Sequence, residues 1–157
     1  MRNRSNSWRI HSLLAASSRR PSPADAPRVK ILIASSSFPP DVGGVAEVAR
    51  TQAAGFVARG HQVTMITGWH PARTEAHAPP GVRVRQFRVT GTDAIGGCDG
   101  EVAAYQEFIV GEPADIVLFH CWQDWGADAA RPVSMASSRT PSARAVVVLF
   151  MPLSKAF

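Results

Sequence analysis

The sequence is poor in cysteine, and its two cysteines are far apart. Cys98 and Cys121 are the only ones among the 157 residues, and they lack the CxxC spacing of a metal or redox motif. Two thiols also cannot supply the disulfide framework of a small secreted domain. We therefore expect both thiols to be reduced, as in a cytoplasmic protein, and we expect no metal site.

Two common nucleotide-binding signatures are missing as well. A dinucleotide fold needs GxGxxG directly after its first strand and an acidic residue near the end of the second strand. Here only Gly43 and Gly44 follow the first apolar run, and the second run ends at Thr67 without an acid. The P-loop pattern GxxxxGK[ST] is absent. Neither NAD binding nor ATP hydrolysis is supported, and we expect no cofactor.

The N-terminal region lacks a long apolar run and carries the excess positive charge. Its longest apolar run, residues 13–16, is too short for a signal peptide or a membrane span. Residues 1–28 hold six of the seventeen basic residues and one of the twelve acidic ones, which leaves eleven of each sign elsewhere. We expect residues 1–28 to be a disordered basic extension, with an organellar transit peptide as the alternative. The neutral remainder gives no indication of nucleic-acid binding.

The remaining residues, 29–157, alternate between strand and helix patterns. The continuous apolar run at 29–35 is typical of a strand buried on both faces of a parallel sheet. The strictly alternating run at 82–89 indicates a half-exposed strand near a sheet edge. The predicted elements are strand 29–35, loop 36–44, helix 45–59, strand 62–67, strand 82–89, Gly-rich loop 90–100, helix 101–110, strand 115–120, short helix 121–130, Ser/Pro-rich linker 131–142 and strand 145–150.

This order of elements predicts an α/β layered, Rossmann-like fold with a mostly parallel sheet. In such sheets ligands bind beyond the carboxyl ends of the strands. Gly43-Gly44, the loop after Thr67, and His120 all follow strands in this way. We therefore expect these three parts of the chain to gather at one edge of the sheet.

The glycine pair stands where a strand gives way to a helix. Glycine lets a backbone approach a ligand closely, and the start of a helix offers free N–H groups and a partial positive charge. A phosphate is the natural guest of such a place. A tight turn without any ligand explains the pair equally well on spacing alone.

The run VKILIASSSFPPDVGGVAEVARTQAAGFVARGHQVTMIT resembles the opening of family-4 glycosyltransferases of the GT-B fold. The similarity continues more loosely through PADIVLFHCW and covers roughly residues 29–130. The resemblance implies the N-terminal, acceptor-side half of an enzyme with two Rossmann-like domains and an active site between them. Such enzymes transfer a sugar from a nucleotide-sugar donor with retention of anomeric configuration, usually without a metal.

The resemblance also assigns roles to individual residues. Gly43 and Gly44 match the loop that approaches the donor diphosphate, and His120 matches a catalytic histidine near the reacting sugar. The family usually ends that strand in His-x-His, whereas Leu118 occupies the first of these positions here. Independently of the resemblance, Trp122, like Trp69 and Trp125, is a candidate for stacking on a sugar or an apolar acceptor, and Asp124 is a candidate for binding acceptor hydroxyls.

Structural roles compete with these assignments. His120 could simply cap its strand, Trp122 could pack in the core, and Asp124 is expected to face solvent. Cys121 beside His120 is a poor nucleophile candidate, because adjacent strand residues point to opposite faces.

The second domain of the resembling enzymes, with its pair of glutamates, has no counterpart in this sequence. We therefore expect residues 29–157 to be a truncated or fragmentary domain, inactive by itself. Its expected partners are a nucleotide sugar, the missing C-terminal domain and an acceptor that is a glycan, a lipid or a small molecule, with peripheral membrane association as an option. The alternative is a non-catalytic α/β module that binds another phosphorylated ligand at the glycine loop.

Overall fold

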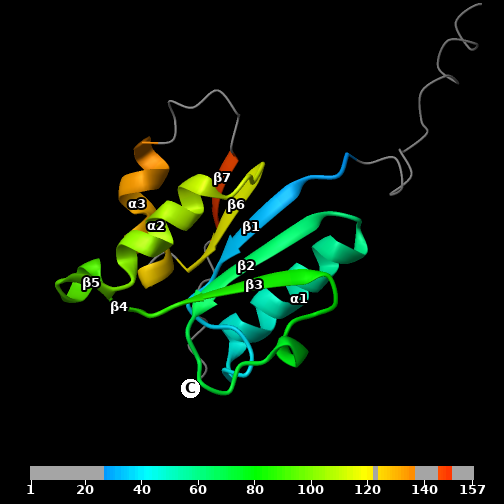
Figure 1. The fold of residues 1–157 in the computed structure, drawn as a ribbon, viewed down its shortest axis with the longest axis horizontal. Coiled ribbons are helices and arrows are strands. Elements are labelled where there is room, and N and C mark those ends of the chain that lie inside the picture. The colour runs from blue at the N-terminus through cyan, green and yellow to red at the C-terminus, as the bar shows by residue number, and fades with distance from the viewer. Residues whose placement is uncertain (1–26, 122–123, 137–144, 150–157) are drawn as a thin grey trace, which may run out of the picture.

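The computed structural model describes residues 27–121, 124–136 and 145–149. Its centre is a five-stranded sheet in which every pairing is parallel (Figure 1). Across the sheet the strands follow the order β3 (Val82–Phe87), β2 (Gln62–Gly68), β1 (Lys30–Ala34), β6 (Ile116–His120) and β7 (Ala145–Leu149). The predicted α/β fold with a mostly parallel sheet is confirmed, and β3 lies at the sheet edge as its alternating pattern indicated.

Helices cover both faces of this sheet (Figure 1). Helix α1 (Gly44–Ala58) packs on one face, and helices α2 (Val102–Gly111) and α3 (Trp125–Ala136) pack on the other. Successive residues of β1 alternate between the two sides: Ile31 and Ile33 face α1, while Leu32 and Ala34 face α2 and α3. Because both sides are buried, β1 has to be apolar throughout, which explains the continuous run in the sequence.

Helix α1 connects β1 to β2 much as the sequence predicts. Gly60 follows it with a φ of +86°, the left-handed conformation that ends helices. The buried stripe of the helix consists of Ala46, Ala49 and Ala53. Small side chains on this stripe let the helix axis lie close to the sheet.

The prediction of a Gly-rich loop at residues 90–100 is wrong. It forms an antiparallel two-stranded sheet of β4 (Val89–Thr92) and β5 (Gly97–Gly100), joined by a single 3-10 turn, Asp93–Ile95. Glycine is depleted in strands, so its density here obscured the pairing. Another 3-10 turn, Glu75–His77, lies between β2 and β3.

The prediction of a linker at residues 131–142 is also partly wrong, because α3 continues to Ala136 and contains Pro132. Proline in a helix interior costs about 3 kcal/mol, so a break there was the natural expectation. Burial of Trp125, Ala129 and Ala130 against α2 and the sheet favours the helix nonetheless. The predicted final strand is present as β7, and it pairs with β6.

Within the described part of the chain, no helix combines the length and apolar character that crossing a bilayer requires. Cys98 and Cys121 are both free thiols. Residues 1–26, the main part of the predicted basic extension, lie outside the described residues.

Candidate functional site

The loops that follow β1 and β2 meet at the carboxyl edge of the sheet, as predicted. The backbone N–H of Gly68, at the end of β2, donates to the carbonyl of Ser36, just after β1, at 3.3 Å. A Cβ at position 68 would lie 2.9 Å from that same carbonyl oxygen, so only glycine fits there. His120 ends β6, the neighbour of β1 on its other side. The three predicted segments therefore share one edge.

The glycine pair occupies open space at this edge. A Cβ built on Gly43 or on Gly44 would meet no atom within 4 Å. Gly43 has a φ of 161° and is therefore extended, a conformation that any residue adopts. A tight turn consequently does not explain why both residues are glycine. No side chain caps α1 at its start, which leaves the first-turn amides without a side-chain acceptor.

His120 is buried beneath α1, with only 2% of its surface exposed. Its Nε2 lies 2.6 Å from Oε1 of Gln52, and its Nδ1 has no hydrogen-bond partner among the described residues. Since a carboxamide oxygen only accepts, Nε2 carries the proton and Nδ1 is an acceptor. Burial lowers the pKa of His120 from 6.5, so the ring is neutral at neutral pH.

The glycine pair and His120 lie at the same edge but at different levels of α1. Gln52 is eight residues beyond Gly44, a distance of about 12 Å along the helix. His120 therefore sits under the third turn of α1, whereas the glycine pair begins its first. The structure brings the two features to one side of the fold without direct contact.

The buried histidine makes folding stability depend on pH. In the unfolded chain the ring titrates near 6.5, and the folded state resists protonation because its pKa is lowered. The stability that neutral His120 provides is thus present above about pH 6.5 and is lost as the pH falls through the folded pKa.

Between about pH 7 and about pH 5, we expect the free energy of unfolding of the wild-type chain to fall more than that of His120→Gln, as measured by urea unfolding. Equal losses in the two proteins would contradict this.

Asp124 has a structural role that the sequence did not reveal. Its Oδ1 accepts from the N–H of Gly126 at 2.7 Å, and its carbonyl accepts from the N–H of Asp128 at 3.1 Å. Asp124 thus caps the start of α3. The expectation that it faces solvent is wrong: burial raises its pKa, opposed by hydrogen bonds from Ser36 and nearby amides. Trp122, the other acceptor candidate, lies outside the described residues.

Cys121 is poorly suited to nucleophilic chemistry. Burial, followed by the charge of Asp124, raises the pKa of its thiol. A raised pKa keeps the sulfur protonated at neutral pH, whereas a nucleophile has to be a thiolate. This agrees with the low weight that the sequence gives to the Cys121 hypothesis.

One aromatic residue and one basic residue are exposed near the same edge. Trp69 follows β2 and is 48% exposed, and the guanidinium carbon of Arg88, after β3, lies 4.3 Å from the centroid of the indole ring. Indole and guanidinium attract each other in this geometry. The sequence alone could not pair Trp69 with Arg88, because the pairing depends on the register of β2 against β3.

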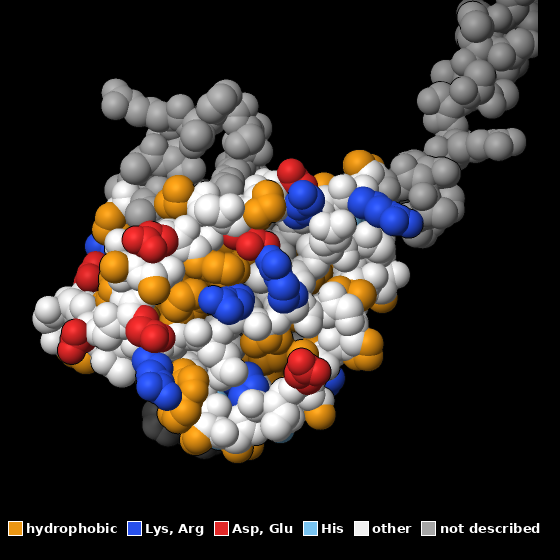
Figure 2. Space-filling model, viewed as in Figure 1, with side chains coloured by type: hydrophobic (Ala, Val, Ile, Leu, Met, Phe, Trp, Pro, Cys, Tyr) orange, Lys and Arg blue, Asp and Glu red, His pale blue; other side chains and the backbone are white. Residues whose placement is uncertain are grey.

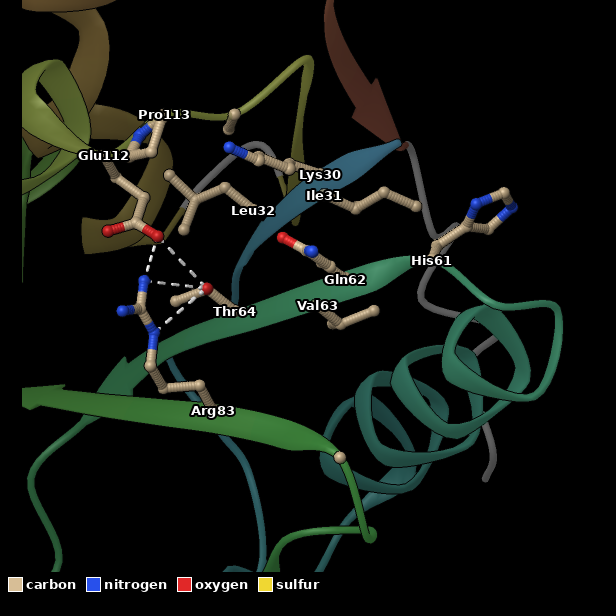
Figure 3. Close-up of a pocket in the computed structure, with 12 residues that line it drawn as sticks. Lys30, Ile31, Leu32, His61, Gln62, Val63, Thr64, Arg83, Glu112 and Pro113 are labelled. Atoms are coloured by element: carbon tan, nitrogen blue, oxygen red, sulfur yellow. Dashed lines mark hydrogen bonds and ion pairs between the residues drawn. The ribbon is translucent and has the colours of Figure 1, made fainter. Parts of the chain in front are cut away.

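A pocket of about 410 Å³ lies at the opposite, amino edge of the sheet (Figure 3). Arg83 donates to Glu112, and the hydroxyl of Thr64 lies between them, 3.3 Å from the Glu112 carboxylate (Figure 3). None of the predicted site residues lines this pocket. The candidate site therefore remains at the carboxyl edge.

One face of the described surface has a mixed charge. Figure 2 shows basic and acidic side chains interspersed over the face that carries α2 and α3, without a continuous basic area. This agrees with the neutral balance of residues 29–157.

A parallel α/β sheet with an open, glycine-rich helix start at its carboxyl edge defines a Rossmann-like module. A family model, described as Glycosyl transferase 4-like domain, matches residues 43–151. The chain belongs to this family and is a glycosyltransferase-type module. The match begins at the glycine pair and includes His120. No curated protein matches the chain.

Proposed function

We propose that this domain is the N-terminal, acceptor-side half of a retaining glycosyltransferase that uses a nucleotide-sugar donor. One observation carries the proposal: Gly43 and Gly44 stand at an uncapped helix start, although nothing in the fold requires glycine at either position. The open space beside the free backbone amides at the start of α1 can accommodate a diphosphate that approaches the backbone. A glycosyltransferase domain binds both a sugar donor and an acceptor, and the glycine pair would contact the donor.

The glycine pair and His120 would act differently in the reaction. Negative charge develops on the diphosphate as its bond to the sugar breaks, and the first-turn amides of α1 would stabilise that charge. Once α1 shifts to expose the ring, Nδ1 of His120 would accept a hydrogen bond from a sugar hydroxyl, because the ring is neutral and Nε2 is engaged by Gln52. A second domain would bind the nucleotide and close the site. This division of labour requires no metal ion.

A non-catalytic module that binds a phosphorylated ligand is the second candidate. The burial of His120 favours it, because a side chain 2% exposed cannot touch a substrate unless α1 or its surroundings move. The glycine pair would then be a binding site without chemistry. The two candidates differ in whether His120 matters once the ligand is bound.

Calorimetry with UDP-, GDP- and ADP-sugars, followed by transfer assays with an added family C-terminal domain, tests both candidates. For the enzyme we expect sugar transfer only when both halves are present, and a loss of about tenfold in His120→Gln, the value of one hydrogen bond. Binding without transfer in every combination would favour the non-catalytic module. Absence of binding to every nucleotide sugar, alone and with the second half, would refute the proposal.

A further inference from the structure

Arg73 is a buried cation in the segment between β2 and β3. Only 2% of its side chain is exposed, which is unusual for an arginine. Burial lowers the pKa of the guanidinium, and the nearby Asp41 carboxylate opposes that shift. A charge buried this deeply has to be paired and hydrogen-bonded, so its acceptors indicate what it holds.

The guanidinium uses all five of its N–H donors. Nε donates to the carbonyl of Pro39 at 2.7 Å, and one terminal nitrogen donates to the carbonyl of Phe38 at 2.5 Å and to Asp41 Oδ2 at 3.1 Å. The other terminal nitrogen donates to the carbonyl of Gly68 and, at 2.9 Å, to Oε1 of Gln86. An arginine has five such donors in a fixed fork, so none is left over.

These contacts join three separate parts of the chain. Three of the five acceptors belong to the loop that leads to the glycine pair, one ends β2, and one lies on β3. The loop is closed on itself as well, since the N–H of Phe38 donates to Asp41 Oδ2 at 3.2 Å. Oε1 of Gln86 also accepts from the N–H of His70 at 3.1 Å. The sheet edge and the loop are thus tied through one side chain.

We propose that Arg73 is a positioning residue that holds residues 38–41, and through them Gly43-Gly44, in the geometry that receives an anionic donor. The inference rests on the proposed function for its ligand. Position 41 is two residues from Gly43, so freedom at Asp41 passes directly to the glycine pair. A loop fixed before binding loses less conformational entropy when the ligand arrives.

The test compares the full chain with Arg73→Lys and Arg73→Met. Lysine keeps the positive charge but offers three donors without the planar fork, while methionine removes the charge. Arg83→Lys is the matched control, because Arg83 lies on the same edge strand as Gln86, but its side chain is 59% exposed and bonds to Thr64 and Glu112 instead of the loop. Hydrogen exchange reports on the loop, and calorimetry with UDP-glucose, GDP-mannose and inorganic pyrophosphate reports on binding.

In Arg73→Lys we expect the amides of residue 38 and residues 41–46 to exchange at least about tenfold faster, and the affinity for the bound probe to fall about tenfold. Amides of β1 and β2 should exchange as in the wild type, and Arg83→Lys should change neither measurement. If Arg73→Met does not fold, Arg73→Lys decides the question.

Unchanged loop exchange in Arg73→Lys, or equal acceleration in the loop and in β1, would overturn the positioning role. Unchanged probe affinity with a loosened loop would overturn it too, since the ordering would not serve binding. A wild-type chain that binds no probe would count against the proposed function, while loop exchange would still report whether Arg73 orders the loop.

Discussion

Gly44→Trp is expected to abolish nucleotide-sugar binding while the stability of the fold changes by no more than about 1 kcal/mol. A Cβ at position 44 meets no atom within 4 Å, so an indole can extend into solvent without strain. Tryptophan also has a better helix propensity than glycine. The same indole would fill the space in front of the first-turn amides, where we place the diphosphate. Calorimetry with a nucleotide sugar and urea unfolding measure the two effects.

Gly111→Trp is the matched control for this change. Gly111 ends α2 and, like Gly44, leaves a Cβ with no neighbour within 4 Å, but the chain continues from it to the amino end of β6. We expect Gly111→Trp to bind the donor as the wild type does. Retained binding in Gly44→Trp would show that the ligand does not approach the glycine pair.

Strands β1 and β6 could be predicted because burial on both faces forces a continuous apolar run. Such a run persists whatever the details of packing, and the order of strands and helices then indicates a parallel sheet. The same logic placed Gly43-Gly44 and His120 at one sheet edge. Their convergence needs only the direction of each strand, which the sequence pattern contains.

Features that depend on contacts between distant segments could not be predicted. Arg73 lies in a stretch without periodicity, and its acceptors come from positions 38–41, 68 and 86. Asp124 fell inside the predicted short helix 121–130, whereas α3 begins at Trp125, so its position as the cap was not predicted. The burial of His120 follows from the packing of α1 through Gln52, a residue with no distinguishing sequence pattern.

Gly100→Ala is expected to destabilise the fold by about 3–5 kcal/mol, although it adds a single methyl group. Gly100 has a φ of +92°, which disfavours any side chain, and its Cβ would lie 2.1 Å from the carbonyl oxygen of Arg88. That oxygen accepts from the N–H of Glu101 at 2.9 Å, where α2 begins. Relief of the clash would therefore separate β4 from β5 or disturb the start of α2. Urea unfolding measures the loss.

Gly96→Ala separates the two causes, because Gly96 has a φ of +105° but open space around its Cβ. We expect it to lose only about 1 kcal/mol, the cost of the backbone conformation alone. Equal losses at both positions would mean that the carbonyl of Arg88 can move away freely. Gly100 is thus glycine because the chain itself leaves no room. At Gly44 the chain leaves ample room, and we propose that glycine is present there because a ligand approaches its backbone.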